Sequence, residues 1–409
     1  MIESQSLACR SCGHAELQTV LSFGRLPLAN ALLTEAQLEQ PEETFPLDLA
    51  FCSSCTLLQL TESVSPEKLF REYVYFSSFS DTMLRHAEDL STDLIGSKHL
   101  DATSLVLEVA SNDGYLLQNY KRAGVPVLGI EPATNIAEVA EQRGIRTICD
   151  FFNDALALKL VEQGYKADVI HAHNVLAHVP DLNGFVCGVS HLLKDDGVIV
   201  VEVPYVTDMI ENCEFDTVYH EHLSYFSLSA LDALFSRNNL IIQKVERVPI
   251  HGGTLRIYAG HGGERDQSVV QLLDHEKANG VVEIDFYKTF GARVEQLRED
   301  LLALLHELKS QDKRIAAYGA SAKGSTLLNY CGIGRETLDY VVDRSTVKQG
   351  RYTPGNHLKI YAPEKLLADA PDHVLLLTWN FAGEILEQQS EYRKLGGRFI
   401  VPVPFVKVV

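Results

Sequence analysis

From about residue 100, short apolar runs alternate along the chain with longer stretches in which apolar residues recur at helical spacing. The apolar runs are LVLEVA (105–110), VLGIE (127–131), DVIHAHNV (168–175) and VIVVEVPY (198–205). This alternation predicts an α/β fold in which helices cover both faces of a parallel sheet. Because ligands of such sheets bind beyond the carboxyl ends of the strands, the residues that follow each run are candidates for a site.

The last third of the chain predicts a second unit of the same kind. Residues 286–310 repeat apolar positions at helical spacing and predict one long helix that links two domains. A strand, a small-residue turn and a helix are expected over 314–330, with further strands in 338–345, in 372–380 and, as the last, in 398–404. The pattern predicts a reduced, Rossmann-like C-terminal domain.

The turn from Gly319 to Gly324 in that unit combines open backbone amides, the Ser321 hydroxyl, the Lys323 ammonium and a helix N-terminus. These are the ingredients of a phosphate site, and we expect Ser321 and Lys323 to hold the diphosphate or nucleoside of a substrate. The spacing is not that of a P-loop, so ATP hydrolysis is not implied. The alternative is a structural turn with a solvent-facing lysine.

Four of the eight cysteines form two CxxC pairs near the N-terminus, Cys9 with Cys12 and Cys52 with Cys55. Two such pairs can present four thiolates tetrahedrally, the geometry that zinc prefers at structural sites. Since sulfur would occupy all four positions, none is left for water, and the metal should stabilise the fold. A redox dithiol is the alternative, but it requires only one CxxC near a βαβ unit.

Charge and composition limit the classes of partner. The 409 residues include 55 acidic and 36 basic side chains, a formal charge of −19 that opposes phosphate backbones and anionic lipid. We expect no nucleic acid and no membrane among the partners. The N-terminus does not resemble a signal peptide, and no apolar run approaches the ~18 residues of a membrane span. A cytoplasmic protein is therefore expected.

The first predicted strand ends in Glu108 and is followed by a turn of small residues. Glu131 ends the second strand, where a carboxylate can accept both hydroxyl hydrogens of a ribose. The turn lacks GxGxxG, which disfavours a nicotinamide or flavin, whereas an acid beside a bound cation suits the sulfonium and amino groups of S-adenosylmethionine. An ordinary βα turn is the alternative. The expected cofactor-binding residues are Glu108, Ala110, Ser111, Asn112, Gly114, Glu131, Pro132 and Asp150, the last facing the adenine.

Two segments are dense in histidine. One is Tyr219-His220-Glu221-His222, and the other runs from His171 to His178 at the end of a predicted strand. If the first is helical, Tyr219 and His222 share a face; if it is extended, Tyr219 and Glu221 do. The sequence leaves open that His-x-His chelates a metal ion or that these side chains only pack.

Several segments together resemble one family of enzymes. EYVYFSSFSDTMLRHAEDL, LEVASNDGYLL, GIEPATNIA, HNVLAHVPDL and YHEHLSYFS, in this order after two CxxC pairs, resemble the C-3-methyltransferases that act on nucleotide-linked (TDP) deoxysugars. The resemblance implies a zinc-binding domain (1–70), a class I S-adenosylmethionine-dependent methyltransferase domain with a helical connector (71–285) and a Rossmann-like nucleotide-sugar-binding domain (286–409). It also implies methyl transfer from S-adenosylmethionine to C-3 of a 4-keto-deoxysugar through an enolate.

The resemblance assigns roles to individual residues. His222 would be the general base, since its ordinary pKa is near neutrality. Tyr219 or His178 would donate to the enolate oxygen, Glu221 would orient a histidine or bind sugar polar groups, and Asn174 would contact the cofactor or hold His178. Tyr75 matches an active-site tyrosine of the family, with Tyr73 as a neighbour at the substrate.

The segment from His251 to Arg256 is expected either to close over the substrate, with Arg256 near phosphate, or to form a hairpin turn. Three rival functions are open: an O- or N-methyltransferase on a small molecule, a non-catalytic nucleotide-sugar-binding protein and a zinc-ribbon RNA-modifying enzyme. The charge of −19 opposes the third.

Overall fold

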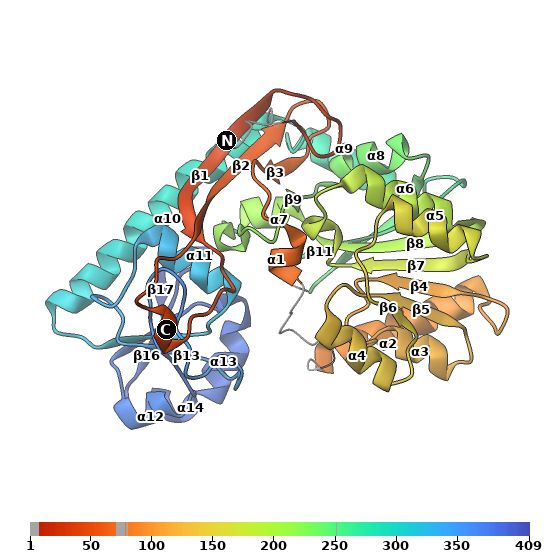
Figure 1. Ribbon diagram of the computed structural model, residues 1–409. Helices are drawn as coiled ribbons and strands as arrows, with labels where there is room; N and C mark the ends of the chain where they lie inside the picture. Colours follow the sequence, from red (N-terminus) through yellow and green to blue (C-terminus); the bar gives the residue numbers. More distant parts are fainter. Residues whose placement is uncertain (1–7, 71–77, 79–80, 251) are drawn as a thin grey trace.

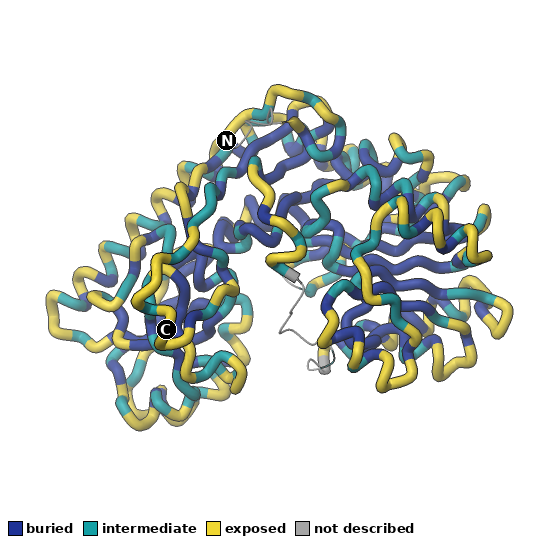
Figure 2. The backbone as a smooth tube through the Cα atoms, viewed as in Figure 1, coloured by how far each residue is buried: buried dark blue, intermediate teal, exposed yellow. Residues whose placement is uncertain are grey.

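Three sheets of mixed α/β structure build the protein (Figure 1). The computed structural model describes residues 8–70, 78, 81–250 and 252–409. In Figure 1 a four-stranded sheet lies at the top, between a central domain on the right and a C-terminal domain on the left. The inner strands of the central and C-terminal sheets are buried, whereas some edge strands are partly exposed, and the helices present their exposed sides outward (Figure 2).

Seven strands form the central sheet in the order β10–β11–β8–β7–β4–β5–β6. The five strands from β4 to β8 are parallel, as the apolar runs predict, whereas β11 is antiparallel to both of its neighbours. The strands are β4 (Val106–Val109), β5 (Val127–Ile130), β6 (Thr147–Ile148), β7 (Ala167–His173), β8 (Leu193–Pro204), β10 (Ile241–Val248) and β11 (Thr254–Gly260). The consecutive strands β10 and β11 therefore form a hairpin, which was one of the two expectations for this part of the chain.

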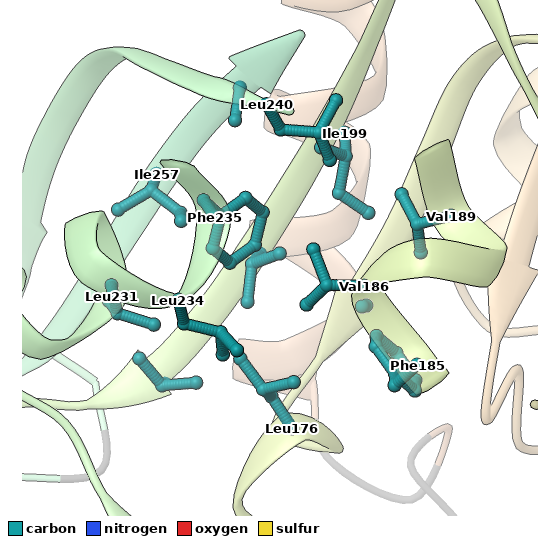
Figure 3. Close-up of a cluster of buried hydrophobic side chains, with 14 of the residues drawn as sticks. Leu176, Phe185, Val186, Val189, Ile199, Leu231, Leu234, Phe235, Leu240 and Ile257 are labelled. Carbon is teal, nitrogen blue, oxygen red and sulfur yellow. The ribbon is translucent and has the colours of Figure 1, made fainter. Parts of the chain in front are cut away.

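Helices cover both faces of this sheet. Successive strand residues point to opposite sides, so neighbouring apolar residues of one strand pack against different helices. Val106 packs on the side of α2 (Asp81–Lys98), α3 (Leu117–Arg122) and α4 (Thr134–Gln142), and Leu107 on the other side. Figure 3 shows Phe185, Val186, Leu234 and Phe235 packed against Ile199 and Ile257 on that second side. The remaining helices of the domain are α5 (Asp154–Glu162), α6 (Leu182–Leu192), α7 (Val206–Glu211), α8 (Leu228–Arg237) and α9 (Gln267–Ala278), with 3-10 turns at Leu176–His178 and Phe215–Thr217.

The four-stranded sheet joins the N-terminal segment to the central domain. Its order is β1 (Leu17–Pro27), β2 (Thr44–Cys52), β3 (Leu58–Leu60) and β9 (Ser224–Tyr225). A 3-10 turn at Glu35–Gln37 precedes β2, and α1 (Pro66–Phe70) follows β3. The sequence does not predict β9, which crosses into this sheet from the central domain.

The C-terminal sheet has the order β14–β13–β12–β15–β16–β17, in which only β17 is antiparallel. The prediction that the strand in 398–404 is the last is wrong, because the two-residue β17 follows it and is too short to show a period. The elements are β12 (Ile315–Tyr318), α11 (Ala322–Cys331), β13 (Val341–Val342), β14 (Ile360–Tyr361), α12 (Lys365–Asp369), β15 (His373–Leu376), a 3-10 turn (Trp379–Phe381), α13 (Ala382–Gln388), α14 (Ser390–Lys394), β16 (Arg398–Val401) and β17 (Lys407–Val408).

The long helix α10 (Ile284–Ser310) confirms the predicted link between domains and runs beside β1 (Figure 1). Tyr287 stacks on Phe51 of β2 with ring centroids 4.6 Å apart. The same buried cluster extends through Leu301 to Ile315 of β12, so α10 packs against both terminal sheets. Among the residues that the structure describes, no helix combines the length and the apolar character needed to cross a membrane.

Candidate active site

The two CxxC pairs meet at one point beside the central domain. The Cys9 and Cys55 sulfurs are 3.4 Å apart, those of Cys12 and Cys52 are 3.5 Å apart, and all four lie within 4.8 Å of one another. Four sulfurs around zinc at bond lengths of about 2.3 Å would be separated by about 3.8 Å, so this donor set fits a tetrahedral ion. Each ligand is a cysteine, so the set is that of a closed, structural site.

The zinc-binding segment is attached to the central domain by polar contacts. The Arg237 side chain donates to the Ser11 carbonyl and to its hydroxyl, both at 3.0 Å, and Asn183 donates to the same carbonyl at 2.8 Å. β3, which leaves the second CxxC pair, is hydrogen-bonded to β9, and the Leu60 N–H donates to the Leu223 carbonyl at 2.9 Å. The strand that starts at the zinc site therefore positions the chain immediately after His222.

His222 is held between a backbone carbonyl and a tyrosine. Its Nδ1 lies 3.0 Å from the Thr217 carbonyl, which can only accept, so Nδ1 carries the proton. In the neutral ring Nε2 is then an acceptor, and the Tyr219 hydroxyl lies 2.9 Å from it. The two rings are 4.1 Å apart, because the chain turns at Tyr219 with the His222 N–H on the Tyr219 carbonyl. Tyr219 and His222 thus share a face, as helical spacing predicts.

Glu221 of the same segment is turned toward the N-terminal domain. Its Oε1 accepts a hydrogen bond of 2.7 Å from the Asn30 side chain. The side chain is buried, and this burial raises the pKa of Glu221 to about 7, against which the Asn30 donation acts. The carboxyl group therefore exchanges its proton near neutral pH.

The second histidine-rich segment meets the first. The ring centroids of His178 and His222 are 4.9 Å apart, and His178 Nδ1 lies 2.6 Å from the Glu221 carbonyl. The Leu223 N–H donates to the Ala177 carbonyl at 2.7 Å. Burial lowers the pKa of His178, against the effect of the carbonyls of Glu221 and Asn174. The structure thus brings His178, Tyr219, Glu221 and His222 into one cluster.

The turn after β4 brings the expected cofactor residues together. Ala110 (φ 54°), Asn112 (φ 49°) and Gly114 (φ 77°) adopt left-handed conformations, which bend the chain sharply. The two Glu131 oxygens accept hydrogen bonds from the Asn112 N–H at 3.0 Å and the Ala133 N–H at 2.9 Å, and so fix this turn. Ser111 is buried within it, Pro132 is half-buried after β5, and Asp150 is exposed after β6.

Glu108 is buried at the carboxyl end of β4. Among the described residues, no hydrogen-bond partner is found for its Oε2. Burial, together with the charges of Glu131 and Asp113, raises the pKa of Glu108 well above its ordinary value. A cationic ligand would relieve this cost, and the acid and turn therefore fit the sulfonium and amino groups of S-adenosylmethionine.

The predicted substrate residues are more dispersed. Ser321 caps α11 by accepting from the Gly324 N–H at 3.1 Å, and the Lys323 ammonium lies 4.8 Å from the centroid of the Trp379 ring. Trp379 donates to the buried Asp216 at 2.7 Å. Tyr73, Tyr75 and His251 lie outside the described residues.

Arg256 lies in a polar network on the central sheet. Its Nε is 2.6 Å from Glu202 Oε1, its Nη1 is 3.2 Å from Glu246, and its Nη2 is 3.0 Å from His86. Carboxylates of the protein thus balance the guanidinium charge, whereas the sequence analysis expected Arg256 near a substrate phosphate. Glu202 also contacts His173 at 3.0 Å.

Sequence reasoning missed this network and missed Asn30. His171 and His173 are two apart in a strand, and this spacing places them on one face of the sheet. From His173 the network continues through His171 to Tyr120, with both hydrogen bonds at 2.9 Å. That spacing was the available signal, whereas nothing around Asn30 in the sequence marks it as a partner of Glu221.

Three family models match successive parts of the chain: a zinc binding domain over residues 9–70, a methyltransferase domain over 83–245 and a C-methyltransferase C-terminal domain over 249–404. C-methyltransferase NovU of Streptomyces niveus is 37% identical over 407 residues, which cover 98% of this chain and 96% of NovU. The chain belongs to the C-methyltransferase family. The predicted S-adenosylmethionine-dependent C-methyltransferase with a zinc-binding domain is confirmed at this level.

The C-methyltransferase also matches more distant proteins over shorter stretches. The ubiquinone biosynthesis O-methyltransferase of Bartonella quintana is 29% identical over 97 residues, 24% of this chain and 39% of that protein. A solved S-adenosylmethionine-dependent methyltransferase from Clostridium acetobutylicum is 14% identical, with a TM-score of 0.36 over 44% of this chain and 92% of that one.

Proposed function

We propose that the enzyme transfers the methyl group of S-adenosylmethionine to C-3 of a nucleotide-linked 4-keto-deoxysugar through an enolate. The observation that carries this proposal is the Tyr219–His222 pair, in which the Thr217 carbonyl leaves Nε2 of a neutral histidine as the acceptor. Methylation of carbon requires removal of a C–H proton, and the carbon beside a ketone is acidic enough for a positioned base. TDP is the favoured nucleotide because of the resemblance to TDP-sugar enzymes.

We assign His222 as the base. Nε2 takes the proton from C-3, and the electron pair of the C–H bond moves into the enolate. In the resting site the single lone pair of Nε2 accepts the Tyr219 hydroxyl 2.9 Å away, so this hydroxyl turns from Nε2 to the enolate oxygen as Nε2 takes the C-3 proton. A donor aimed at a developing oxyanion contributes about 10²–10³-fold to rate. One pair of residues therefore serves for both proton removal and oxyanion stabilisation.

His178 and Glu221 border this pair. Both are fixed by contacts outside the reacting centre, His178 by the Glu221 carbonyl and Glu221 by Asn30. We propose that they bind polar groups of the sugar ring and orient C-3 toward His222. Tyr75, with Tyr73 beside it in sequence, and Asn174 remain proposals from the resemblance. The role of His251 at the substrate remains a proposal from the two glycines that follow it in sequence.

S-adenosylmethionine supplies the electrophilic methyl group, bonded to a sulfonium. We propose that Glu108 and the turn of Ala110, Ser111, Asn112 and Gly114 receive its cationic part. Among the described residues, each Glu131 oxygen accepts one backbone hydrogen bond, so both retain capacity for ribose hydroxyls, and Pro132 and Asp150 would lie toward the adenine. C-3 of the enolate then forms the new C–C bond as the sulfur takes back its electron pair.

We further propose that Ser321 and Lys323 at the turn before α11 contact the nucleotide part of the substrate. The turn lies at the carboxyl end of β12, where ligands of parallel sheets bind. We also propose that the domains meet near residues 70 and 285. The enzyme would bind no nucleic acid and would be a monomer.

Mass spectrometry of a reaction in deuterated buffer tests the proposal. The enzyme and S-adenosylmethionine would be given a panel of TDP- and GDP-linked 4-keto-deoxysugars. We expect one added methyl group on carbon with at least one TDP-sugar. Deuterium exchange without methylation would support enolate formation and show that the acceptor differs in detail. Neither result with any sugar, although S-adenosylmethionine binds, would overturn the sugar assignment.

A further inference from the structure

A separate set of metal-ligating side chains lies between α5 and α6, apart from the four cysteines. It consists of Asp154, Cys187 and His191. Cys187 and His191 are four residues apart on α6 and therefore share one face of that helix. Asp154 is the first residue of α5, so two neighbouring helices contribute to the cluster.

The close approach of the two helices depends on Gly188. A Cβ atom added there would lie 3.1 Å from the Ala157 Cβ and 3.2 Å from the Asn153 carbonyl oxygen. Glycine at this position thus lets α6 approach the first turn of α5. That contact brings the Asp154 carboxylate to the two side chains of α6.

Two of the three distances within the cluster match the edges of a tetrahedral site, and the third is at most 4.8 Å. Cys187 Sγ is 3.5 Å from His191 Nε2, and His191 Nε2 is 3.5 Å from Asp154 Oδ1. With zinc bonds of about 2.3 Å to sulfur, 2.0–2.1 Å to nitrogen and 2.0–2.2 Å to oxygen, ligands would be about 3.6 Å (S to N) and 3.4 Å (N to O) apart. The side chains need little movement to bind one ion.

The charges around the cluster also favour a cation. Asp154 Oδ1 is buried, and its ion-pair contact among the described residues is to His191 within the cluster itself. The ion pairs of the described residues include none from lysine or arginine to Asp154, and Asp181 adds a second negative charge near Cys187. The group of His86, His173 and Glu202 differs, because the Arg256 guanidinium lies 2.6 Å from Glu202 and would repel a metal ion.

We propose that Asp154, Cys187 and His191 bind a divalent transition-metal ion, with Zn²⁺ as the favoured one, and that water completes the tetrahedron. Sulfur, nitrogen and oxygen ligands together suit zinc or cobalt. The side chains of His191 and Asp154 are 43% and 41% exposed, so this ion would exchange more readily than one enclosed by the four cysteines. The bound ion would join α5 to α6 and stabilise the central domain by mass action.

Cobalt titration of the full-length, zinc-loaded enzyme tests this site. With zinc retained at the four cysteines, added Co²⁺ should produce one thiolate-to-cobalt charge-transfer band and the intense visible bands of tetrahedral cobalt. Cys187→Ser should lose the charge-transfer band, and His191→Ala should bind Co²⁺ at least ten-fold more weakly. Cys149→Ser, which removes an exposed thiol outside the cluster, should titrate as the wild type does.

A thermal measurement provides an independent outcome. Added Zn²⁺ should raise the Tm of the wild type and of Cys149→Ser but not that of Cys187→Ser, while all three proteins unfold at similar temperatures without added metal. Equal cobalt binding by wild type and Cys187→Ser, or no charge-transfer band in the wild type, would overturn the proposal.

Discussion

The Asn30 side-chain amide donates a 2.7 Å hydrogen bond to the carboxyl group of Glu221, 191 residues further along the chain. Asn30 belongs to the zinc-binding segment, and Glu221 belongs to the histidine cluster of the methyltransferase domain. The contact opposes the rise in the pKa of Glu221 that burial causes. The N-terminal domain therefore contributes to the ionisation of a proposed active-site group as well as to the fold.

Asn30→Ala should shift the pH dependence of methyl transfer. Burial already raises the pKa of Glu221 to about 7, and loss of the amide donor raises it further. If the ionised carboxylate binds the sugar, kcat/KM rises as pH passes through this pKa, and the acidic limb should move to higher pH in the variant. A pH profile of kcat/KM for both proteins provides the measurement.

The control for this shift is Glu221→Gln, which keeps an oxygen for Asn30 but removes the titrating group. In that background Asn30→Ala should leave the acidic limb where it is. A uniform loss of kcat/KM at every pH, with no movement of the limb, would mean that Asn30 acts only on folding.

His222→Gln should lower the rates of methyl transfer and of deuterium exchange at C-3 by roughly 10²–10⁴-fold, because a positioned base contributes this much to the rate. Tyr219→Phe should retain more exchange than His222→Gln, since Nε2 is still available, but should slow methyl transfer through loss of the oxyanion donor. Mass spectrometry in deuterated buffer measures both quantities, and equilibrium binding of S-adenosylmethionine verifies the fold. Exchange at the wild-type rate in His222→Gln would remove His222 from the role of base.

Glu202→Gln should reduce the free energy of unfolding by about 3–5 kcal/mol, because breaking a buried ion pair leaves the partner charges uncompensated. Glu202 contacts Arg256, His86 and His173, and these contacts hold its pKa well below the ordinary value. This contribution is present above the ordinary carboxyl pKa and is lost as pH falls below it. Urea denaturation at neutral pH and at about pH 4 measures both effects.

Glu246→Gln is the matched control for that variant. Glu246 also contacts Arg256, at 3.2 Å, but its side chain is 32% exposed. A pair of this kind contributes about 0–1 kcal/mol. Equal losses of unfolding free energy in Glu202→Gln and Glu246→Gln would contradict the assignment of the main stabilising contact to Glu202.

The sequence patterns predict most of the parallel strands because each contains a run of apolar residues, and they predict α10 because its helical period extends over many turns. The resemblance to one family predicts that His178 and His222 lie in one site, and their ring centroids are 4.9 Å apart. The sequence patterns miss β9, whose two residues pair with β3 about 165 positions earlier, as Leu58 opposite Tyr225 shows. The ion pair of Arg256 with Glu202 is missed for a similar reason: Glu202 lies on a neighbouring strand, and register between strands is not visible in one sequence.

Loss of the zinc site should unfold the region that supports the histidine cluster. Cys9→Ser removes one of four sulfurs, and structural zinc contributes on the order of 10 kcal/mol in small zinc domains. Because β3 leaves the second CxxC pair and is hydrogen-bonded to β9, we expect S-adenosylmethionine binding, thermal stability and methyl transfer to fall together. Zinc content, calorimetry and cofactor binding would be measured on the same preparation, with His222→Gln as the variant that loses chemistry alone. A Cys9→Ser protein with wild-type stability and cofactor affinity but no methyl transfer would instead place the metal in the reaction.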